Sequence, residues 1–393
     1  MQSARLAFAR ALGLSACLCI ASCSGIPKFP AAGVFLGERV ETTVDSEVAR
    51  YYLETYLQGR NEDPGIHASI DAVYRRYDQP IPSREELATL SRELSVDFAA
   101  LFLADRLLAD ECNRNVNRSF ARHLAEKDAA GPDASAYLLL FVPGWDYADM
   151  GHLTGADFAQ PRKLATRFGF ENYLVELPPT GSVEENAQVL AAQIARHASS
   201  GKKLLLAGAS SAGPAIHLAL AELLGRRELK AIAAWLNLGG ILQGSPMVEY
   251  FQSGPRRLFF ELGVWRKGWS RDAVLSLGTG PGRKRFQRLR IDADILVVNY
   301  LGIPLSGQVG RYSRDNYPLL GRDGPNDGLT LLADAIAPDS LTVIALGSDH
   351  FFAEDPRIDE KTVALMKVMI TWIEQRTALR DNAECRCPSM SRR

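Results

Sequence analysis

The sequence lacks an excess of charge of either sign. Its 45 lysines and arginines nearly balance its 46 acidic residues, so the formal net charge is −1 over 393 residues. Proteins that neutralise nucleic-acid phosphates usually carry a basic surplus, so no nucleic-acid partner is expected. The chain also has no internal repeat and no low-complexity segment. With 47% hydrophobic residues, it can bury the core of one large domain or two smaller ones.

Cysteine is scarce, with six residues in all. Beyond the first 23 residues only Cys112, Cys385 and Cys387 remain. No third and fourth ligand accompanies the Cys-x-Cys pair at a suitable spacing, so neither a metal nor another cofactor is expected. An oxidising compartment would permit a disulfide from Cys112 to either Cys385 or Cys387.

The amino terminus has too short an apolar run to cross a membrane. Arg5 and Arg10 precede about a dozen apolar or small residues, which is typical of a secretory signal. Ile20-Ala-Ser-Cys23 resembles the lipobox of bacterial lipoproteins, and residues 14–17 fit less well because fewer apolar residues precede them. The resemblance implies that residues 1–22 are removed and that acylated Cys23 anchors the protein in the bacterial cell envelope. No acidic retention-type residue directly follows Cys23, which favours the outer membrane over the inner. An ordinary cleaved signal is the alternative.

Residues 23–42 have no periodicity and are predicted to form a tether. Residues 43–130, here called the amino-terminal segment, are predicted to be helical. Asp45 or Ser46 is suited to cap a first helix. Ser83-Arg-Glu-Glu86 reads as a capping box that opens a second helix, with Leu87 to Leu101 contributing one apolar face. The segment carries no recognisable chemistry, so a packing or docking role is expected and any protein partner is unknown.

From residue 131 the pattern changes to short apolar runs that alternate with helical stretches. The runs are continuous, as expected for strands buried on both faces: Tyr137–Val142, Tyr173–Leu177, Lys203–Gly208, Ala231–Leu238, Ile295–Tyr300 and Leu341–Leu346. Helices are expected at Ser182–His197 and near 360–376. This alternation predicts an α/β domain over residues 131–376, with a doubly wound, mostly parallel sheet, and a tail over 377–393.

Two adjacent serines, Ser210 and Ser211, follow the third of these strands. Catalytic groups collect where parallel strands end, and a nucleophile there needs small residues two positions before and after it. Both serines satisfy this condition. Ser210 is favoured because the strand then runs almost to the turn, whereas Ser211 would put Gly208 within the strand end. A helix-capping role is the alternative for both.

A serine nucleophile needs a base, and His350 has the most suitable position among six histidines. It follows the last strand, from where a loop could carry it over the serine turn. His217 lies roughly 10 Å down the helix that follows the turn, which is too far away. His152 could line the pocket. The others lie in the amino-terminal segment or near the opposite end of the sheet.

The third member of such a site is an acid that orients the imidazole. Asp315, Asp323 and Asp327 follow the penultimate strand. Asp327 is preferred because it precedes Gly328 and a helical run that it could also cap, and Asp323 is the second choice. Asp349 adjoins the histidine and is expected to point away from its ring.

The chain resembles the α/β-hydrolase family over residues 135–376. The resemblance rests on the order Ser…Asp…His, the serine turn, the Asn-Asp-Gly segment after the penultimate strand and the Gly-x-Asp-His sequence after the last. The resemblance implies a triad of Ser210, Asp327 and His350, with the Trp145 and Ser211 amides as the oxyanion hole. Two departures are Ala212, where the family usually has glycine, and Pro143-Gly144, where it usually has His-Gly. The implied function is a serine esterase or lipase acting on esters or thioesters. An amidase or peptidase, or a non-catalytic envelope scaffold, are the alternatives.

Residues 247–290, here called the cap, lie between the fourth and fifth strands, where the family commonly inserts a lid. Arginines and lysines there alternate with Phe259, Phe260, Trp265 and Trp269, a mixture suited to an anionic lipid surface. We therefore expect an apolar acyl group in the substrate, although the rings could simply pack the cap onto the core. The glycine-rich run Gly278–Arg285 lacks a phosphate-loop ending and is expected to be a flexible basic loop.

Overall fold

The structure, a computed structural model, describes residues 28–126 and 133–381. The predictions for residues 1–22 and Cys23 lie outside these residues. Cys112 is one half of a disulfide, but the choice between Cys385 and Cys387 also falls outside them. No helix in the described part of the chain combines the length and apolar character that crossing a membrane requires. Over the same residues, no three His, Cys, Asp or Glu side chains are grouped to hold a metal ion.

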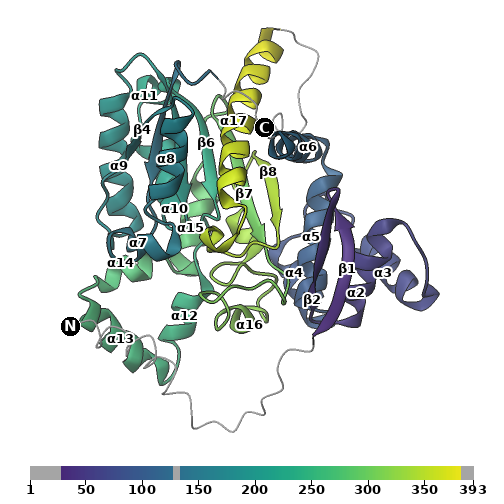
Figure 1. Cartoon of the computed structure of the whole chain (residues 1–393). Coiled ribbons are helices and arrows are strands. Elements are labelled where there is room, and N and C mark those ends of the chain that lie inside the picture. The colour runs from purple at the N-terminus through teal and green to yellow at the C-terminus, as the bar shows by residue number, and fades with distance from the viewer. Residues whose placement is uncertain (1–27, 127–132, 382–393) are drawn as a thin grey trace.

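Six parallel strands form the central sheet, in the order β4-β3-β5-β6-β7-β8 (Figure 1). Their bounds are Tyr137–Val142 (β3), Glu171–Leu174 (β4), Lys203–Ala209 (β5), Ile232–Leu238 (β6), Leu296–Ile303 (β7) and Leu341–Leu346 (β8). The predicted α/β class and the parallel sheet are confirmed. The second strand lies earlier than predicted: residues 171–174 pair with β3, and the apolar residues Val175 and Leu177 belong to the loop that follows.

Helices cover both faces of the sheet because successive side chains of β3 alternate between two cores. Leu139 and Phe141 pack in a cluster with residues of α6 (Glu111–Ala125), α8 (Ala159–Arg167) and α17 (Ile358–Asp381). Leu138 and Leu140 face the other cluster, with residues of α9 (Val183–His197) and α10 (Ala212–Leu218). This is the doubly wound arrangement expected from uninterrupted apolar strands. Helix α17 continues five residues past the predicted end at 376.

Residues 29–44 form a β-hairpin, so the prediction of a tether there is wrong. Strands β1 (Phe29–Phe35) and β2 (Glu38–Val44) pair antiparallel. The turn between them, Leu36-Gly37, has φ angles of 52° and 81°. Positive φ at both central residues matches the twist of a two-residue hairpin, and Gly37 adopts it at little cost.

The rest of the amino-terminal segment is helical: α2 (Glu47–Glu54), α3 (Pro64–Arg76), α4 (Arg84–Glu93), α5 (Val96–Ala109) and α6, with a 3-10 turn at Tyr56–Gln58. Ser46 caps α2 and the Ser83–Glu86 capping box opens α4. The predicted second helix is in fact two. Ser95 accepts a hydrogen bond from Phe98 N and thereby starts α5 as a new helix.

Helix α6 covers the outer edge of β8, the last strand of the sheet. Asn113 Oδ1 accepts from Thr342 N at 2.8 Å, and Asn117 Oδ1 accepts from Ile344 N at 2.9 Å. Asn117 Nδ2 donates to Thr342 O at 2.8 Å. The two side chains thus take the place of a neighbouring strand and satisfy an edge that would otherwise be open to pairing with another chain.

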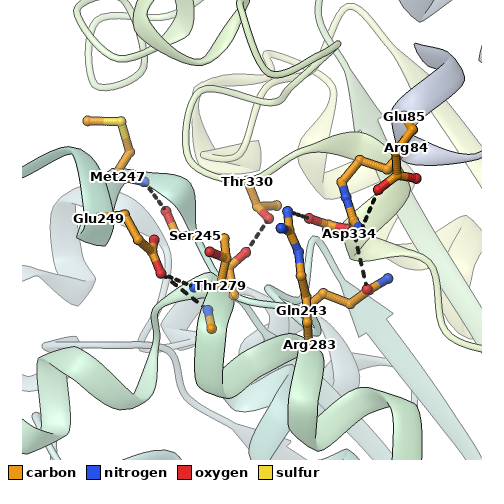
Figure 2. Close-up of polar contacts among 12 residues, drawn as sticks. Arg84, Glu85, Gln243, Ser245, Met247, Glu249, Thr279, Arg283, Thr330 and Asp334 are labelled. Atoms are coloured by element: carbon orange, nitrogen blue, oxygen red, sulfur yellow. Dashed lines mark hydrogen bonds and ion pairs between the residues drawn. The ribbon is translucent and has the colours of Figure 1, made fainter. Parts of the chain in front are cut away.

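Between β6 and β7 the cap consists of four helices: α12 (Pro246–Gln252), α13 (Arg256–Lys267), α14 (Arg271–Ser276) and α15 (Thr279–Arg288). The glycine-rich run is therefore helical, and the prediction of a flexible basic loop is wrong. Glu249 Oε1 accepts from Thr279 N and Gly280 N at 2.6 and 3.2 Å (Figure 2). A carboxylate of the chain itself thus occupies the start of α15, where an anion would otherwise bind.

Shorter elements complete the chain. They are α7 (Tyr147–Thr154), α11 (Arg226–Ala231), α16 (Tyr317–Leu320), a π-helical turn at Ala219–Leu223 after α10, and 3-10 turns η3 (Leu332–Ala335) and η4 (Phe352–Glu354).

Candidate active site

Ser210 lies at the tip of a sharp turn between β5 and α10. Its φ is 54°, in the left-handed region that residues other than glycine rarely adopt. The turn brings strand and helix so close that a Cβ at Gly208 would lie 2.2 Å from Ile216 Cδ1. A strained serine on a strand-to-helix turn lined with small residues is the arrangement that exposes a nucleophilic hydroxyl.

Ser211 has a different conformation and different surroundings. Its backbone is right-handed helical, with φ −62°, and it lies at the N-cap position of α10 without a side-chain capping bond. Its side chain is buried. Of the two serines, only Ser210 contacts the histidine described next.

His350 approaches Ser210 from the loop after β8. The two atoms His350 Nε2 and Ser210 Oγ are 2.9 Å apart. His152 is instead exposed on α7. His217 is packed against Trp235 and Phe286, and burial, followed by the nearby Arg285, lowers its pKa to about 4. A neutral, enclosed imidazole of that kind is part of the core.

Asp327 completes the arrangement. Its Oδ2 lies 2.8 Å from His350 Nδ1, and its Oδ1 accepts from Leu329 N at 2.9 Å and Thr330 N at 2.8 Å. Both carboxylate oxygens are therefore used, and the carboxylate is fixed in orientation. The helical run expected after it is only a turn leading to η3. Asp323, the second choice, is exposed.

Asp349 turns away from the imidazole, as expected. Its carboxylate accepts from Gly310 N and Phe351 N, each at 2.9 Å. These bonds fix the loop that carries His350. Among the described histidines and carboxylates, the structure thus brings together the three residues selected from the sequence, and it gives Asp349 a supporting role beside them.

The loop after β3 lies directly beside Ser210. A Cβ built on Gly144 would lie 3.5 Å from Ser210 Cβ, which is van der Waals contact. Gly144 N donates to Ala156 O and Asp146 N donates to Pro179 O. Among the backbone bonds of the described turns and loops, the intervening Trp145 N and the Ser211 N have no acceptor. These two amides are the donors that the resemblance implies for an oxyanion hole.

The cap reaches this loop through a pair of tryptophans. The rings of Trp145 and Trp269 meet edge to face with centroids 5.6 Å apart. Lys267 Nζ lies 5.6 Å from the centre of the Trp269 ring. Trp269 therefore packs against the candidate site. This is the position expected if its ring serves to pack the cap onto the core.

Helix α13 presents a different kind of surface. Leu258, Phe259, Leu262 and Trp265 are each between 56% and 77% exposed. Arg256, Arg257, Arg266 and Lys267, which are also exposed, flank them. Phe259 and Trp265 consequently do not pack the cap onto the core. We call these four apolar residues the α13 face.

Sequence reasoning missed the residues that hold the acid in place. Asn326 Oδ1 accepts from Gly328 N at 2.9 Å, and Asn326 Nδ2 donates to Tyr317 O at 3.2 Å. Gly328 has a φ of 90° and lies so close to Ser313 that a Cβ would be 2.3 Å from the Ser313 Cβ. The sequence Asn326-Asp327-Gly328 was the available signal for these contacts, since Asn and Gly are typical of such turns.

Comparison with known proteins supports the fold assignment. No family model and no curated protein matches the sequence. Among solved structures, the metagenomic carboxyl esterase MGS0156 is 19% identical with a TM-score of 0.51, over 64% of this chain and 80% of that one. Bacillus licheniformis lipase BlEst2 is 19% identical with a TM-score of 0.44, over 65% and 94%. Esterase B of Lactobacillus rhamnosis is 14% identical with a TM-score of 0.39, over 72% and 100%. Together with the sheet order, the first of these similarities identifies an α/β-hydrolase fold.

Proposed function

We propose that this protein is a serine hydrolase that cleaves carboxylic esters or thioesters with an apolar acyl group. One observation carries the proposal: the unbroken series of contacts from Ser210 Oγ through His350 to Asp327, starting at a serine with positive φ. Capping or packing explains a single serine or histidine at such a junction, but neither explains this order of atoms.

In the proposed mechanism, Ser210 Oγ attacks the acyl carbon while its proton passes to His350 Nε2. The carbonyl electron pair moves onto oxygen, where the Trp145 and Ser211 amides stabilise it. Each donor is worth about 3 kcal/mol to the transition state. His350 then gives the proton to the departing alcohol or thiol, which leaves an acyl-Ser210 ester. Water, deprotonated by His350, attacks that ester and releases the acid and free Ser210.

Two alternatives use the same residues differently. An amidase or peptidase needs the same proton transfers but a poorer leaving group, so the relative rates on matched esters and amides separate the two. A non-catalytic scaffold needs neither the backbone strain at Ser210 nor an Asp327 carboxylate with both oxygens hydrogen-bonded. The presence of both features favours catalysis.

The membrane part of the proposal rests on the α13 face and on the lipobox. Exposed apolar side chains flanked by basic ones suit a surface of anionic lipid. An acyl chain on Cys23 would hold the protein at the bacterial envelope, with the outer membrane as the preferred location. The substrate would then reach the cap from the lipid side, which favours an apolar acyl group.

A fluorophosphonate probe tests the central claim, because it reacts with activated serines and with little else. We expect labelling of the wild-type protein at Ser210, established by peptide mass spectrometry, and loss of ester hydrolysis in the same sample. An unlabelled protein, or a label on another residue, would refute the assignment.

A further inference from the structure

The amino-terminal segment reaches the base of the cap through one arginine. Arg84, the first residue of α4, donates from Nη1 to Asp334 Oδ1 at 2.7 Å. Arg283 of the cap helix α15 donates from Nη2 to Asp334 Oδ2 at 3.2 Å. Figure 2 shows the two guanidinium groups meeting at this carboxylate. Because the Asp334 side chain is 0% exposed, it depends on these partners for its charge to be compensated.

Arg84 also contacts the chain where it enters the cap. Its Nη1 lies 3.3 Å from Gln243 Oε1 (Figure 2). Gln243 N also donates to Asp334 O at 3.2 Å. A single guanidinium group therefore holds two segments together: the one that leads into the cap and the η3 turn that contains Asp334.

The same junction holds the candidate acid. Thr330 Oγ1 donates to Gly244 O at 2.9 Å, and Thr330 N donates to Asp327 Oδ1 at 2.8 Å. Ser245 Oγ donates to Leu329 O. The segment 243–245 is thus bonded to residues 329 and 330, whose backbone amides in turn orient the carboxylate that faces His350.

The junction has no spare room. A Cβ at Gly282 of α15 would lie 2.5 Å from the carbonyl carbon of Gln243, and a Cβ at Gly244 would lie 2.2 Å from Gly278 O. Helix α15 and the segment 243–245 are in direct backbone contact. A shift of either one must therefore move the other, and with it Thr330.

We propose that Arg84 is a positioning residue for the reaction. It acts through Asp334, Gln243 and Thr330 to hold the Asp327 carboxylate against His350, and it contacts no substrate itself. The amino-terminal segment thereby contributes to catalysis and not only to packing. This inference rests on the proposed function, because the triad must be the reacting group for its alignment to affect turnover.

Replacing Arg84 by glutamine tests the proposal on the full-length protein. We expect kcat on a soluble p-nitrophenyl ester to fall about 10-fold or more while KM stays within about twofold, because the acid is misaligned but the binding site is untouched. The acidic limb of the kcat/KM profile should move to lower pH, since a weaker contact with Asp327 stabilises the imidazolium less. Arg84→Lys, which keeps the charge, should recover part of the loss.

Arg76→Gln is the matched control, because Arg76 is a guanidinium of the same segment whose ion pair with Glu93 is exposed. It should leave kcat and the pH profile as in the wild type. The double variant Arg84→Gln/Asp334→Asn removes the buried carboxylate together with Arg84, so that no buried charge is left with only one of its two partners; Arg283, the other partner, is partly exposed. This keeps the test informative if Arg84→Gln alone does not fold. The double variant should show the same loss of kcat. Unchanged kinetics in the double variant, or an equal loss with Arg76→Gln, would overturn the proposal.

A spectroscopic signal separates this inference from the proposed function. The proton between His350 Nδ1 and Asp327 should give a far-downfield NMR resonance in the wild type and in Arg76→Gln, and a weakened or shifted one in Arg84→Gln. If there is no ester turnover although the wild type shows the resonance and Arg84→Gln alters it, the proposed function fails, while Arg84 still aligns Asp327 with His350. If turnover is present and the resonance is identical in Arg84→Gln, the positioning role fails alone.

Discussion

His350 and Asp327 are joined by two hydrogen bonds, one between their side chains and one between their backbones. His350 Nδ1 lies 2.8 Å from Asp327 Oδ2, and His350 N donates to Asp327 O at 2.9 Å. The second bond connects the loops after β7 and β8 at the position of the side-chain contact. The imidazole is thus aligned by main-chain geometry as well as by its own partner.

Exchange of each serine for alanine distinguishes the two neighbours. Ser210→Ala should lower kcat on the order of 10⁶-fold and abolish fluorophosphonate labelling, because the nucleophile is gone. Ser211→Ala should keep much of the hydrolysis and of the labelling, since the backbone amide that serves as the oxyanion donor remains. Loss of labelling confined to the Ser211 variant would assign the nucleophile to Ser211 instead.

Asp327→Asn should lower kcat by about 10³- to 10⁴-fold with little change in KM, because the amide no longer stabilises the imidazolium. Asp323→Asn, in an exposed residue of the same loop, serves as the control and should have wild-type activity. Steady-state kinetics and circular dichroism of both variants would establish whether activity or folding has changed. Damage by the Asp323 change with an intact Asp327 variant would contradict the assignment of the acid.

The two cap tryptophans should behave differently, because only one is exposed. Trp265→Ser combined with Phe259→Ser should reduce activity on esters presented in anionic vesicles several-fold and leave activity on a soluble short-chain ester unchanged. Trp269→Ala, which removes the ring that packs on Trp145, should reduce activity on both substrates. Equal losses for the Trp265/Phe259 variant on both substrates would mean that the α13 face has no role at a lipid surface.

A buried carboxyl in the amino-terminal segment predicts how stability depends on pH. Burial, followed by the charge of Asp45, raises the pKa of Asp97 to about 7. The folded state therefore holds this proton more tightly than the unfolded chain, whose aspartates titrate near 4. The contribution of Asp97 to the free energy of unfolding should be fully present below about pH 4 and should be lost as the pH rises toward 7.

Urea unfolding at pH 5 and pH 8 measures this dependence. In Asp97→Asn, the decline between the two pH values should be smaller than in the wild type, because the replaced group no longer titrates. Asp359→Asn, in an exposed residue of α17, should leave the decline as it is. An identical decline in Asp97→Asn and the wild type would mean that Asp97 ionises normally.

The sheet could be predicted because both of its faces are buried. Uninterrupted apolar runs as short as Tyr137–Val142 and Leu341–Leu346 are typical of strands in the interior of a parallel sheet. The hairpin at residues 29–44 was missed because Pro30, Ala31, Ala32 and Gly33 leave its first strand without a clear apolar alternation, and because the only turn signal is Gly37. The boundary at Ser95 was missed because the apolar periodicity of α4 and α5 continues across it. The break is caused locally, because the Ser95 hydroxyl accepts a hydrogen bond from Phe98 N and thereby starts a new helix.

The candidate triad could be selected from the sequence because each member has a fixed place relative to a strand end. Ser210 follows β5, Asp327 follows β7 and His350 follows β8. The supporting contacts could not be selected this way. Arg84 and Asp334 are separated by 250 positions. Arg84 lies within a capping box, which indicates only a helix start, and Asp334 lies in no motif. Only the packing of the amino-terminal segment against the cap base brings them together.

Because α6 covers the edge of β8, the packing of α6 cannot be completed until β8 has been synthesised. Asn113 and Asn117 bind Thr342 and Ile344, which are synthesised 229 and 227 positions later. Helix α6 must therefore wait for the last strand of the sheet before these two polar side chains are satisfied. Such distant pairing slows folding and leaves an incomplete chain with an unprotected sheet edge. A version of this protein that ends before residue 341 should accordingly remain unable to fold, however complete its serine turn.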